Sequence, residues 1–332
     1  MAFDTPIALL VFNRPEQTRR VFAEVAKVRP RKLLIVADGP RSNVPGEVER
    51  CAEVRGIVEA VDWECTVLRH YADLNLGCRR RVSSGLDWVF SQCEEAIILE
   101  DDCLPHPTFF RFCEDLLDRF RDNERVMMIS GDSFYVSPSR EPFSYRFSRY
   151  NFIWGWASWR RAWRHYDVSL SSWPALRETD WLRRITGSRA SARYWRRTFD
   201  QVYRGEIDTW DYQWMFASWK ADGMAVIPTV NLVTNIGFGE GATHTGGESR
   251  LANLPASAME FPLRHPRSSA PDHRADRIVA DQVFEWVVPS RTRLFLHRLR
   301  ARLPLLVPTR TRHALRKLFG LPTAPVIPGS TP

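Results

Sequence analysis

Three consecutive carboxylates, Glu100, Asp101 and Asp102, follow directly on an apolar run at residues 96–99. The run predicts a buried strand, so the acids would crowd together where that strand ends. Neighbouring carboxylates repel one another unless a cation or a hydrogen-bond donor neutralises them. Their hard oxygens suit Mg²⁺ or Mn²⁺, which often combine one or two carboxylates with substrate phosphates. The alternative is a solvated turn at an acidic helix N-terminus.

The elements that would position these acids alternate along the first half of the chain. Strands are expected at residues 7–12, 33–37, 66–69, 96–99 and 126–130, with helices at 15–28, 46–61, 80–92 and 109–121. This alternation indicates an α/β fold, a doubly wound and mostly parallel sheet flanked by helices. Ligands of such sheets bind beyond the carboxyl ends of the strands. Asn13-Arg14, Asp38-Gly39 and the acidic triplet all follow predicted strands.

The second half of the chain is less periodic. Residues 145–219 are rich in aromatic side chains, and short strands are expected at 226–228 and 231–235. Residues 237–247 hold five glycines, which predicts a loop that permits close backbone approach. We therefore expect a main domain over residues 1–247, divided at about residue 132 into two halves. Residues 248–286 would be an extended surface segment.

Composition bounds the class of protein. With 332 residues, 44% hydrophobic and 26% charged, the chain is typical of a globular protein and not of a disordered one. No apolar run approaches the roughly 20 residues that span a bilayer, and no signal segment is recognisable, so a cytoplasmic location is expected. The six cysteines form no C-x-x-C pair, which favours free thiols over zinc or disulfides.

The net charge of +8 comes from the last part of the chain. Residues 287–332 carry nine Lys or Arg and no acid, which leaves 38 of the 47 basic groups against 39 acids before them. Residues 287–332 are therefore predicted to form a basic, amphipathic tail. It could meet an anionic membrane surface from the cytoplasmic side or pack as a solvated terminal helix, and both interpretations are open. Nucleic-acid binding is not expected, because no recognised module accompanies the charge.

The motifs at the strand ends and the aromatic segments after them occur along the chain in an order that resembles GT-A-fold glycosyltransferases. The Glu-Asp-Asp triplet resembles the metal motif of the N-acetylglucosaminyltransferase I type. Segments 155–159 (Gly-Trp-Ala-Ser-Trp) and 237–245 resemble bacterial sugar transferases of the GT2-like group. The resemblance spans roughly residues 5–245. It implies a nucleotide-sugar donor, Mn²⁺ or Mg²⁺, and a glycan or lipid-linked acceptor in surface polysaccharide synthesis. The half up to about residue 132 would bind the nucleotide, and the half from residue 133 would bind the acceptor. An inverting mechanism is expected.

The resemblance also implies roles for single residues. Asp102 would ligate the metal, with Glu100 and Asp101 beside the nucleoside sugar. Asp38 matches the position that contacts the base, and Asn13 and Arg14 lie where the nucleotide enters. The alternatives are a turn residue for Asp38 and a helix cap with a surface cation for Asn13 and Arg14.

Other cleft residues are expected from the same pattern. Arg79, with Arg80 and Arg81, would supplement the metal near the diphosphate or form a solvated surface. His244 would complete the metal shell or touch the diphosphate. Trp156 would line the pocket for donor or acceptor, with burial in the core as the alternative.

Asp211 is the expected catalytic base, which removes the proton from the attacking acceptor hydroxyl. Its aromatic neighbours would raise its basicity by desolvation and offer flat faces to a sugar. Asp208 is the competing carboxylate. The alternative places Trp210 and Trp214 in the core at helical spacing, with Asp211 on the wet face.

Two other classes of function are weighed against a glycosyltransferase. A sugar-phosphate nucleotidyltransferase would also use a doubly wound sheet and metal-binding acids, but would usually carry a glycine-rich phosphate loop after its first strand. A non-catalytic carbohydrate-binding protein on the same fold would be expected to have lost the acid cluster.

Overall fold

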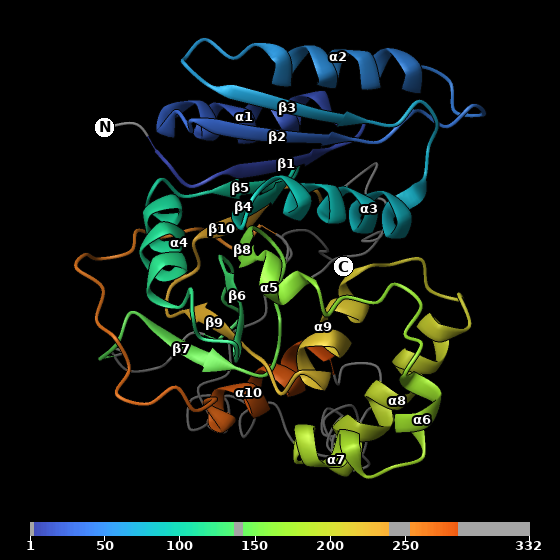
Figure 1. Cartoon of the computed structure of the whole chain (residues 1–332), viewed down its shortest axis with the longest axis vertical. Coiled ribbons are helices and arrows are strands. Elements are labelled where there is room, and N and C mark those ends of the chain that lie inside the picture. The colour runs from blue at the N-terminus through green and yellow to red at the C-terminus, as the bar shows by residue number, and fades with distance from the viewer. Residues whose placement is uncertain (1–2, 136–141, 239–252, 285–332) are drawn as a thin grey trace, which may run out of the picture. The chain divides into compact units, whose positions relative to one another are not determined.

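An eight-stranded sheet in the order β3-β2-β1-β4-β8-β6-β9-β7 forms the centre of the computed structural model (Figure 1). Strands β5 and β10 form a separate two-stranded sheet. The structure describes residues 3–135, 142–238 and 253–284. The strands span Ile7–Val11 (β1), Lys32–Ala37 (β2), Thr66–Tyr71 (β3), Glu95–Glu100 (β4), Cys103–Pro105 (β5), Val126–Ser130 (β6), Tyr145–Ser148 (β7), Trp156–Trp159 (β8), Met224–Pro228 (β9) and Val233–Asn235 (β10).

The first four strands are parallel, and their order places β1 at the point where the chain reverses its winding. Strand β1 pairs in parallel with β2 on one side and with β4 on the other. Strand β8 is antiparallel to β4 and β6, and β7 is antiparallel to β9, so six of the eight strands run the same way. This confirms the predicted mostly parallel, doubly wound sheet.

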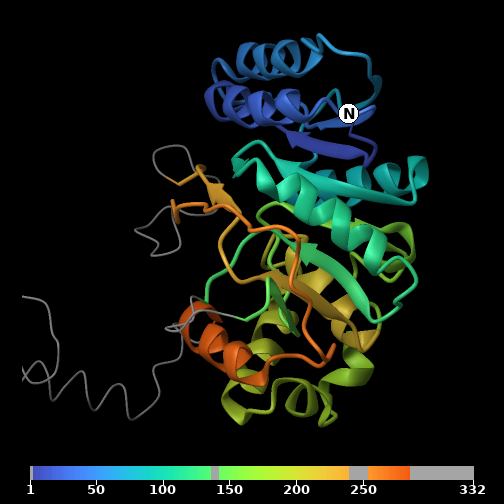
Figure 2. The ribbon, with the colours of Figure 1, turned by 90° about the vertical axis from the view of Figure 1, so that its left-hand side faces the viewer.

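Helices cover both faces of the sheet, and they gather at its two ends in both views (Figure 2). Helices α1 and α2 lie at the β1–β3 end, and α6 to α9 lie at the other. The helices span Pro15–Val28 (α1), Glu47–Glu59 (α2), Gly77–Gln92 (α3), Thr108–Arg119 (α4), Arg160–Trp163 (α5), Trp173–Arg177 (α6), Trp181–Thr186 (α7), Arg189–Tyr203 (α8), Asp211–Lys220 (α9), His273–Val279 (α10) and the π-helix Ala280–Phe284.

Alternating side chains of the central strands build two hydrophobic cores. Ile7, Leu9 and Val11 of β1 pack with α1, α2 and α4, whereas Ala8 and Leu10 pack with α3 on the other face. Successive side chains of a strand point to opposite faces. A parallel strand covered on both faces therefore appears in sequence as an unbroken apolar run, which is why these strands could be predicted.

The aromatic middle of the chain contains elements that its sequence did not predict. Trp156 was expected to line a pocket or to lie in the core, and residues 156–159 form β8, a fully buried strand between β4 and β6. Trp156 stacks on Trp210 with ring centroids 5.8 Å apart and packs against Trp214 at 5.9 Å. Strands β5 and β7 were likewise not predicted, because each is only three or four residues long.

The described part of the chain lies in one compact unit, residues 1–284, and the unit formed by residues 285–332 lies outside the described residues. The predicted basic tail belongs to that second unit. Within the described ranges, no helix is both long enough and apolar enough to cross a membrane. All six cysteines are free thiols, as expected.

Removing the indole at position 156 should test the aromatic core. We expect Trp156→Ala to lower the free energy of unfolding by about 3–5 kcal/mol, because it leaves a large cavity beside two other indoles. Urea titration followed by circular dichroism measures the change. Tyr203→Ala, at a side chain that is 49% exposed, is the control and should change stability by less than about 0.5 kcal/mol. A Trp156→Ala protein as stable as this control would contradict the assignment.

Candidate functional site

A cleft of about 900 Å³ opens beyond the carboxyl ends of β1, β2 and β4. This is the edge of a doubly wound sheet at which ligands bind, beside the strand where the winding reverses. One wall comes from the strand ends and the start of α3, and the other from the segment before α9. The charged side chains that line it are Arg14, Asp38, Arg41, Arg81, Glu100, Asp101, Asp102, Glu206, Asp208 and Asp211.

The acidic triplet meets Arg14 at the centre of this cleft. Leu10 of β1 lies opposite Glu100 of β4, so the two chains leave the sheet side by side. The backbone N–H of Phe12 donates to Asp101 Oδ2 at 3.0 Å. Arg14 Nη1 lies 2.5 Å from Asp102 Oδ2 and 3.7 Å from Asp101 Oδ1. The guanidinium from the end of β1 therefore provides positive charge for the acids at the end of β4.

The charges of this group depend on one another because the group is buried. Burial raises the pKa of Glu100 well above its usual range, and the charges of Asp102, Asp101 and Asp211 raise it further. Burial and Asp102 also raise the pKa of Asp101, while Arg14 opposes the shift. Burial lowers the pKa of Arg14, but the carboxylates outweigh that effect and raise it overall. The crowding of three acids beside Arg14 therefore favours the protonated forms of Glu100 and Asp101.

The carboxylates of this group are hard oxygen ligands of the kind that divalent ions take. Across the described ranges, no three His, Cys, Asp or Glu side chains are arranged to hold a metal by themselves. Mg²⁺ and Mn²⁺ commonly take only one or two carboxylates and complete their shell with water and phosphate. Asp102, with Asp101 beside it, would hold such an ion.

The segment after β10 closes tightly over the ion pair. The backbone N–H of Ile236 donates to the Asp102 carbonyl at 2.8 Å. A Cβ at Gly237 would overlap Asp102 Oδ2 and approach Arg14 Nη1 to 2.9 Å. The glycine-rich segment was expected to allow close backbone approach, and Gly237 does so directly against Asp102 and Arg14.

Asp38 holds the base of the cleft together. Its Oδ1 accepts hydrogen bonds from the N–H groups of Gly39 and Leu76, both at 2.9 Å. Its Oδ2 accepts from Asn75 Nδ2 at 3.0 Å and from the Gly77 N–H at 3.2 Å. A carboxylate has about four acceptor sites, and these four donors occupy them. Asp38 was expected to contact the base; it lines the cleft, but it fastens the end of β2 to the start of α3.

Asn75 is a residue that the sequence did not single out. Its two amide protons point at Asp38 Oδ2 and at the Gly39 carbonyl, both 3.0 Å away. These two acceptors fix the orientation of the side-chain amide, and Asn75 itself lines the cleft. The Asn-x-Gly pattern at residues 75–77, between β3 and α3, is the turn signal that could have identified it.

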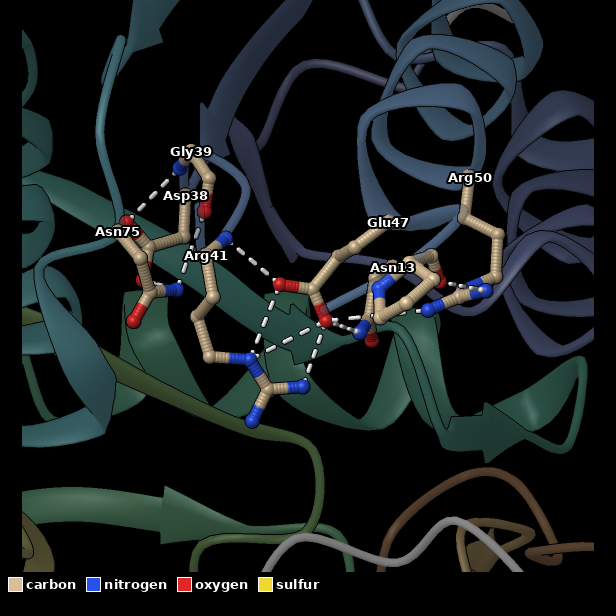
Figure 3. Close-up of polar contacts among 8 residues, drawn as sticks. Asn13, Asp38, Gly39, Arg41, Glu47, Arg50 and Asn75 are labelled. Carbon is tan, nitrogen blue, oxygen red and sulfur yellow. Dashed lines mark hydrogen bonds and ion pairs between the residues drawn. The ribbon is translucent and has the colours of Figure 1, made fainter. Parts of the chain in front are cut away.

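Glu47, at the start of α2, organises the neighbouring wall (Figure 3). Its side chain is fully buried and accepts from Asn13 Nδ2 at 2.7 Å and from the Arg41 N–H at 2.7 Å. Arg41 Nη2 lies 2.5 Å from Glu47 Oε1. Hydrogen bonds from Arg41 hold the pKa of Glu47 at about 2, although burial opposes them. Glu47 thus orients both Asn13 and Arg41 where they line the cleft.

Of the three consecutive arginines, Arg81 and not Arg79 lines the cleft. Arg79 pairs with Asp208, with Nε and Oδ1 3.4 Å apart. Arg81 Nη2 donates to the His70 carbonyl at 2.6 Å, and burial lowers its pKa while Asp38 opposes that effect. Arg79 thus lies beside a residue of the cleft and does not line it, and its contact with a diphosphate stays a prediction. Helical phase decides this, since residues two apart point to different sides.

Asp211 faces the triplet from the opposite wall. It is the first residue of α9, where the helix dipole favours a negative charge, and Thr209 Oγ1 donates to its Oδ1. Trp210 and Tyr212 line the cleft beside it, but Trp210 is only 2% exposed and Trp214 is wholly buried, so both indoles belong to the core, as the alternative predicted. The charge of Asp211 contributes to the raised pKa of Glu100, so the two walls act on each other.

The remaining site predictions have different outcomes. Trp156 does not line the cleft, because β8 places its side chain in the core with no exposed surface. The expectation that it binds the donor is wrong, and burial was the correct alternative. His244 lies outside the described residues. Asn13, Arg14, Glu100, Asp101, Asp102 and Asp211 are brought together in one cleft.

The chain was compared with known proteins. No protein family model and no curated protein sequence matches it. Its fold is similar to S. aureus TarS residues 1–349, with a TM-score of 0.38 and 8% identity over 69% of this chain and 59% of that one. A 4-diphosphocytidyl-2C-methyl-D-erythritolsynthase from Anaerococcus prevotii DSM 20548 gives 0.33 and 8% over 67% and 88%. A UDP-glucose pyrophosphorylase complexed with UDP-glucose gives 0.25 and 10% over 45% and 64%.

These similarities are weak. The chain spans 59% of the length of the TarS structure that it matches. TM-scores this low establish neither a family nor an activity, so the chemistry of the cleft has to indicate the function.

The pH dependence of stability should show whether the ionised carboxylate of Glu47 stabilises the fold. Because its pKa is about 2 in the fold against 4.5 in the unfolded chain, its ionised form stabilises the fold above about pH 4.5. This contribution is lost as the pH falls through about 2. The difference in unfolding free energy between wild type and Glu47→Gln should therefore be full at neutral pH and shrink between pH 4.5 and 2, measured by denaturant titration at several pH values.

The matched control for this experiment is Glu49→Gln, which removes an exposed carboxylate from the same helix. Its stability should follow that of wild type at every pH. A wild-type advantage over Glu47→Gln that stayed constant down to pH 2 would contradict the role assigned to the ionised carboxylate.

Proposed function

We propose that this protein is a glycosyltransferase that moves a sugar from a nucleotide-sugar donor to an acceptor hydroxyl. The donor diphosphate would bind with Mn²⁺ or Mg²⁺ at Asp102. The acceptor would be a glycan or a lipid-linked sugar of a surface polysaccharide. A contact of the basic tail, residues 287–332, with an anionic membrane surface belongs to the same proposal.

One observation carries this proposal. The cleft brings the acids at the end of β4 and Asp211 at the start of α9 to facing walls, although they are more than a hundred residues apart in sequence. One wall offers cations and oxygen ligands suited to a diphosphate. The other offers a carboxylate among aromatic side chains, which suits a sugar hydroxyl and its C–H surface. A transfer between a nucleotide and a sugar needs both kinds of wall.

The residues of the cleft would divide the work. Arg14 and Arg81 supply positive charge where the diphosphate would lie. Glu47 holds Asn13 and Arg41, and these two side chains would lie beside the nucleoside end of the donor. Asp211 would accept the proton of the acceptor hydroxyl as it attacks the anomeric carbon from the face opposite the leaving diphosphate, which inverts that carbon. Asp208 is less suited to this role because it pairs with Arg79 and is largely exposed.

The connection after the first strand favours sugar transfer over nucleotidyl transfer. Strand β1 ends at Val11 and α1 begins at Pro15, so only Phe12, Asn13 and Arg14 lie between them. A glycine-rich loop that cradles a triphosphate would need glycines and more residues there. The intact acid cluster likewise favours an enzyme over a carbohydrate-binding protein that has lost its chemistry.

A melting screen tests the donor proposal. We expect at least one nucleoside diphosphate or nucleotide sugar to raise the melting temperature of the full chain in the presence of Mn²⁺. Binding at 100 times the dissociation constant adds about 2.7 kcal/mol of stability, which such a screen resolves. Asp102→Ala should lose this stabilisation, because it removes the carboxylate that would hold the ion. If no nucleotide shifts the melting temperature with metal present, the proposal fails.

Substitution of Asp211 should separate donor binding from sugar transfer. Asp211→Asn should keep the affinity for the donor but lower transfer to an acceptor by about 10²- to 10⁴-fold, the usual contribution of a general base. Asp208→Asn is the control, since it removes a nearby carboxylate from the same segment. Titration calorimetry measures donor binding, and product analysis measures transfer. Full transfer by Asp211→Asn, or a comparable loss in Asp208→Asn, would overturn the assignment of the base.

A further inference from the structure

Helices α7 and α8 carry a run of positive charge that no acid interrupts. Residues 181–199 hold six arginines and neither Asp nor Glu, whereas the first 286 residues as a whole are close to neutral. These two helices lie at the end of the sheet opposite α1 and α2 (Figure 1). The run is separate in sequence from the basic tail at residues 287–332, so it is a second concentration of positive charge.

A tight turn joins α7 to α8 and brings their arginines together. Gly187 ends α7 in the left-handed conformation, at φ 65°, and its N–H donates to the Arg183 carbonyl at 3.0 Å. The side chain of Ser188 then caps the first turn of α8. The two helices pack on each other, so Arg184 and Arg189 flank the turn of one helical hairpin.

The two faces of α8 differ in character. Trp195 and Phe199 are buried in the aromatic core. Arg189, Arg193 and Arg197 are exposed, and their spacing of four residues places them on one face of the helix. The buried face fixes α8 on the body of the protein, and the opposite face therefore presents the arginines to the outside.

These arginines lack the partners that other exposed arginines have. Exposed arginines on α1, on β3 and after α4 each pair with a Glu, at N–O distances of 3.1, 2.5 and 3.1 Å. Across the described ranges, no ion pair or side-chain hydrogen bond engages the five residues that we call the arginine face: Arg184, Arg189, Arg193, Arg196 and Arg197. Their charge is therefore available to a partner.

The arrangement destabilises α8 when nothing is bound to it. Arg189 and Arg193 are four residues apart, as are Arg193 and Arg197, and like charges at this spacing repel each other along a helix. The first turn of α8 contains Arg189 and no acid, although the helix dipole favours negative charge there. Folding alone does not account for this pattern, because an acid in the first turn would stabilise the helix. An anionic partner would relieve both kinds of repulsion.

We infer that the arginine face docks on an anionic lipid bilayer. Guanidinium groups form paired hydrogen bonds with phosphate oxygens, and basic side chains near an anionic membrane are attracted to it. At the end of α8, Tyr203 is 49% exposed, and an amphipathic tyrosine ring is typical of a membrane–water interface. Contact with nucleic-acid phosphates would not require this ring, so the tyrosine favours a bilayer as the partner.

The arginine face is followed in sequence by the wall of the cleft that would hold the acceptor. Helix α8 ends at Tyr203, and Glu206, Ile207 and Asp208 line the cleft directly after it. Docking through α8 would keep this wall close to the lipid surface, where a lipid-linked acceptor presents its sugar. This last step rests on the proposed function, but the docking itself does not.

Co-sedimentation of the full chain with lipid vesicles tests the docking. The anionic vesicles contain phosphatidylcholine and phosphatidylglycerol in equal parts, and the neutral vesicles contain phosphatidylcholine alone. We expect the triple variant Arg189→Gln/Arg193→Gln/Arg197→Gln to bind the anionic vesicles about a hundredfold more weakly than wild type, because each basic residue near such a surface contributes about fivefold to the affinity.

Two matched variants accompany this measurement. Arg19→Gln/Arg69→Gln/Arg121→Gln removes the same number of positive charges from other elements and should bind within about twofold of wild type, because charges more than about 10 Å from the surface are screened. Lysine at the three substituted positions of α8 keeps their charge and should retain most of the binding. Thermal unfolding identifies folded variants, and the glutamine variant of α8 should be at least as stable as wild type because it loses the repulsion.

The outcomes decide both the surface and its partner. The docking is wrong if the glutamine variant of α8 binds anionic vesicles as tightly as wild type, or if the control variant loses as much. Equal binding of wild type to neutral vesicles would contradict a contact through charge. If wild type binds a double-stranded DNA oligonucleotide more tightly than anionic vesicles, and loses it with the same substitutions, nucleic acid replaces lipid as the partner. Vesicle binding needs no donor, so a failed nucleotide screen ends the proposed function and leaves this result unaffected.

Discussion

Three carboxylates at the end of one buried strand need positive charge, and the structure supplies it from the strand beside them. Strands β1 and β4 run parallel with Leu10 opposite Glu100, so the chain leaving β1 passes the triplet within reach. The Phe12 N–H and the Arg14 guanidinium both turn to these acids. Breaking a buried ion pair by removing one partner is costly. The route of the chain between β1 and α1 therefore depends on the acids at the end of β4, and the close approach of Gly237 depends on both.

The other polar walls of the cleft are held by the same principle, with one buried carboxylate joining several segments. Asp38 receives four donors from residues 39 and 75–77, which ties β2 to the start of α3. Glu47 accepts hydrogen bonds from Asn13 and Arg41, which links the segments after β1 and β2 to α2 (Figure 3). Asp38 and Glu47 can therefore support the walls of the cleft without contacting a ligand. Both carboxylates are buried, and a buried charge is costly unless it is paired and hydrogen-bonded.

The aromatic residues divide between packing and the cleft. Trp156, Trp163 and Trp214 fill the core behind the cleft, with ring centroids of Trp163 and Trp214 5.2 Å apart. Trp210 touches both regions, because it stacks on Trp156 and lines the cleft. The segment that carries Asp211 is thus anchored by indoles on its buried side. This packing positions Asp211 at the start of α9, facing the triplet from the opposite wall.

The sequence by itself determined the class of fold and the edge of the sheet at which polar residues gather, because strands covered on both faces must be apolar throughout and their polar ends stand out. It also singled out the acids and Asp211, which line one cleft. Only the tertiary structure decided which side chains meet. It paired Arg14 with Asp102, turned Arg81 instead of Arg79 into the cleft, placed Trp156 in the core, and gave Glu47 and Asn75 their roles. Local periodicity shows which residues share a face, but contacts between distant segments depend on how β1, β2 and β4 are placed side by side.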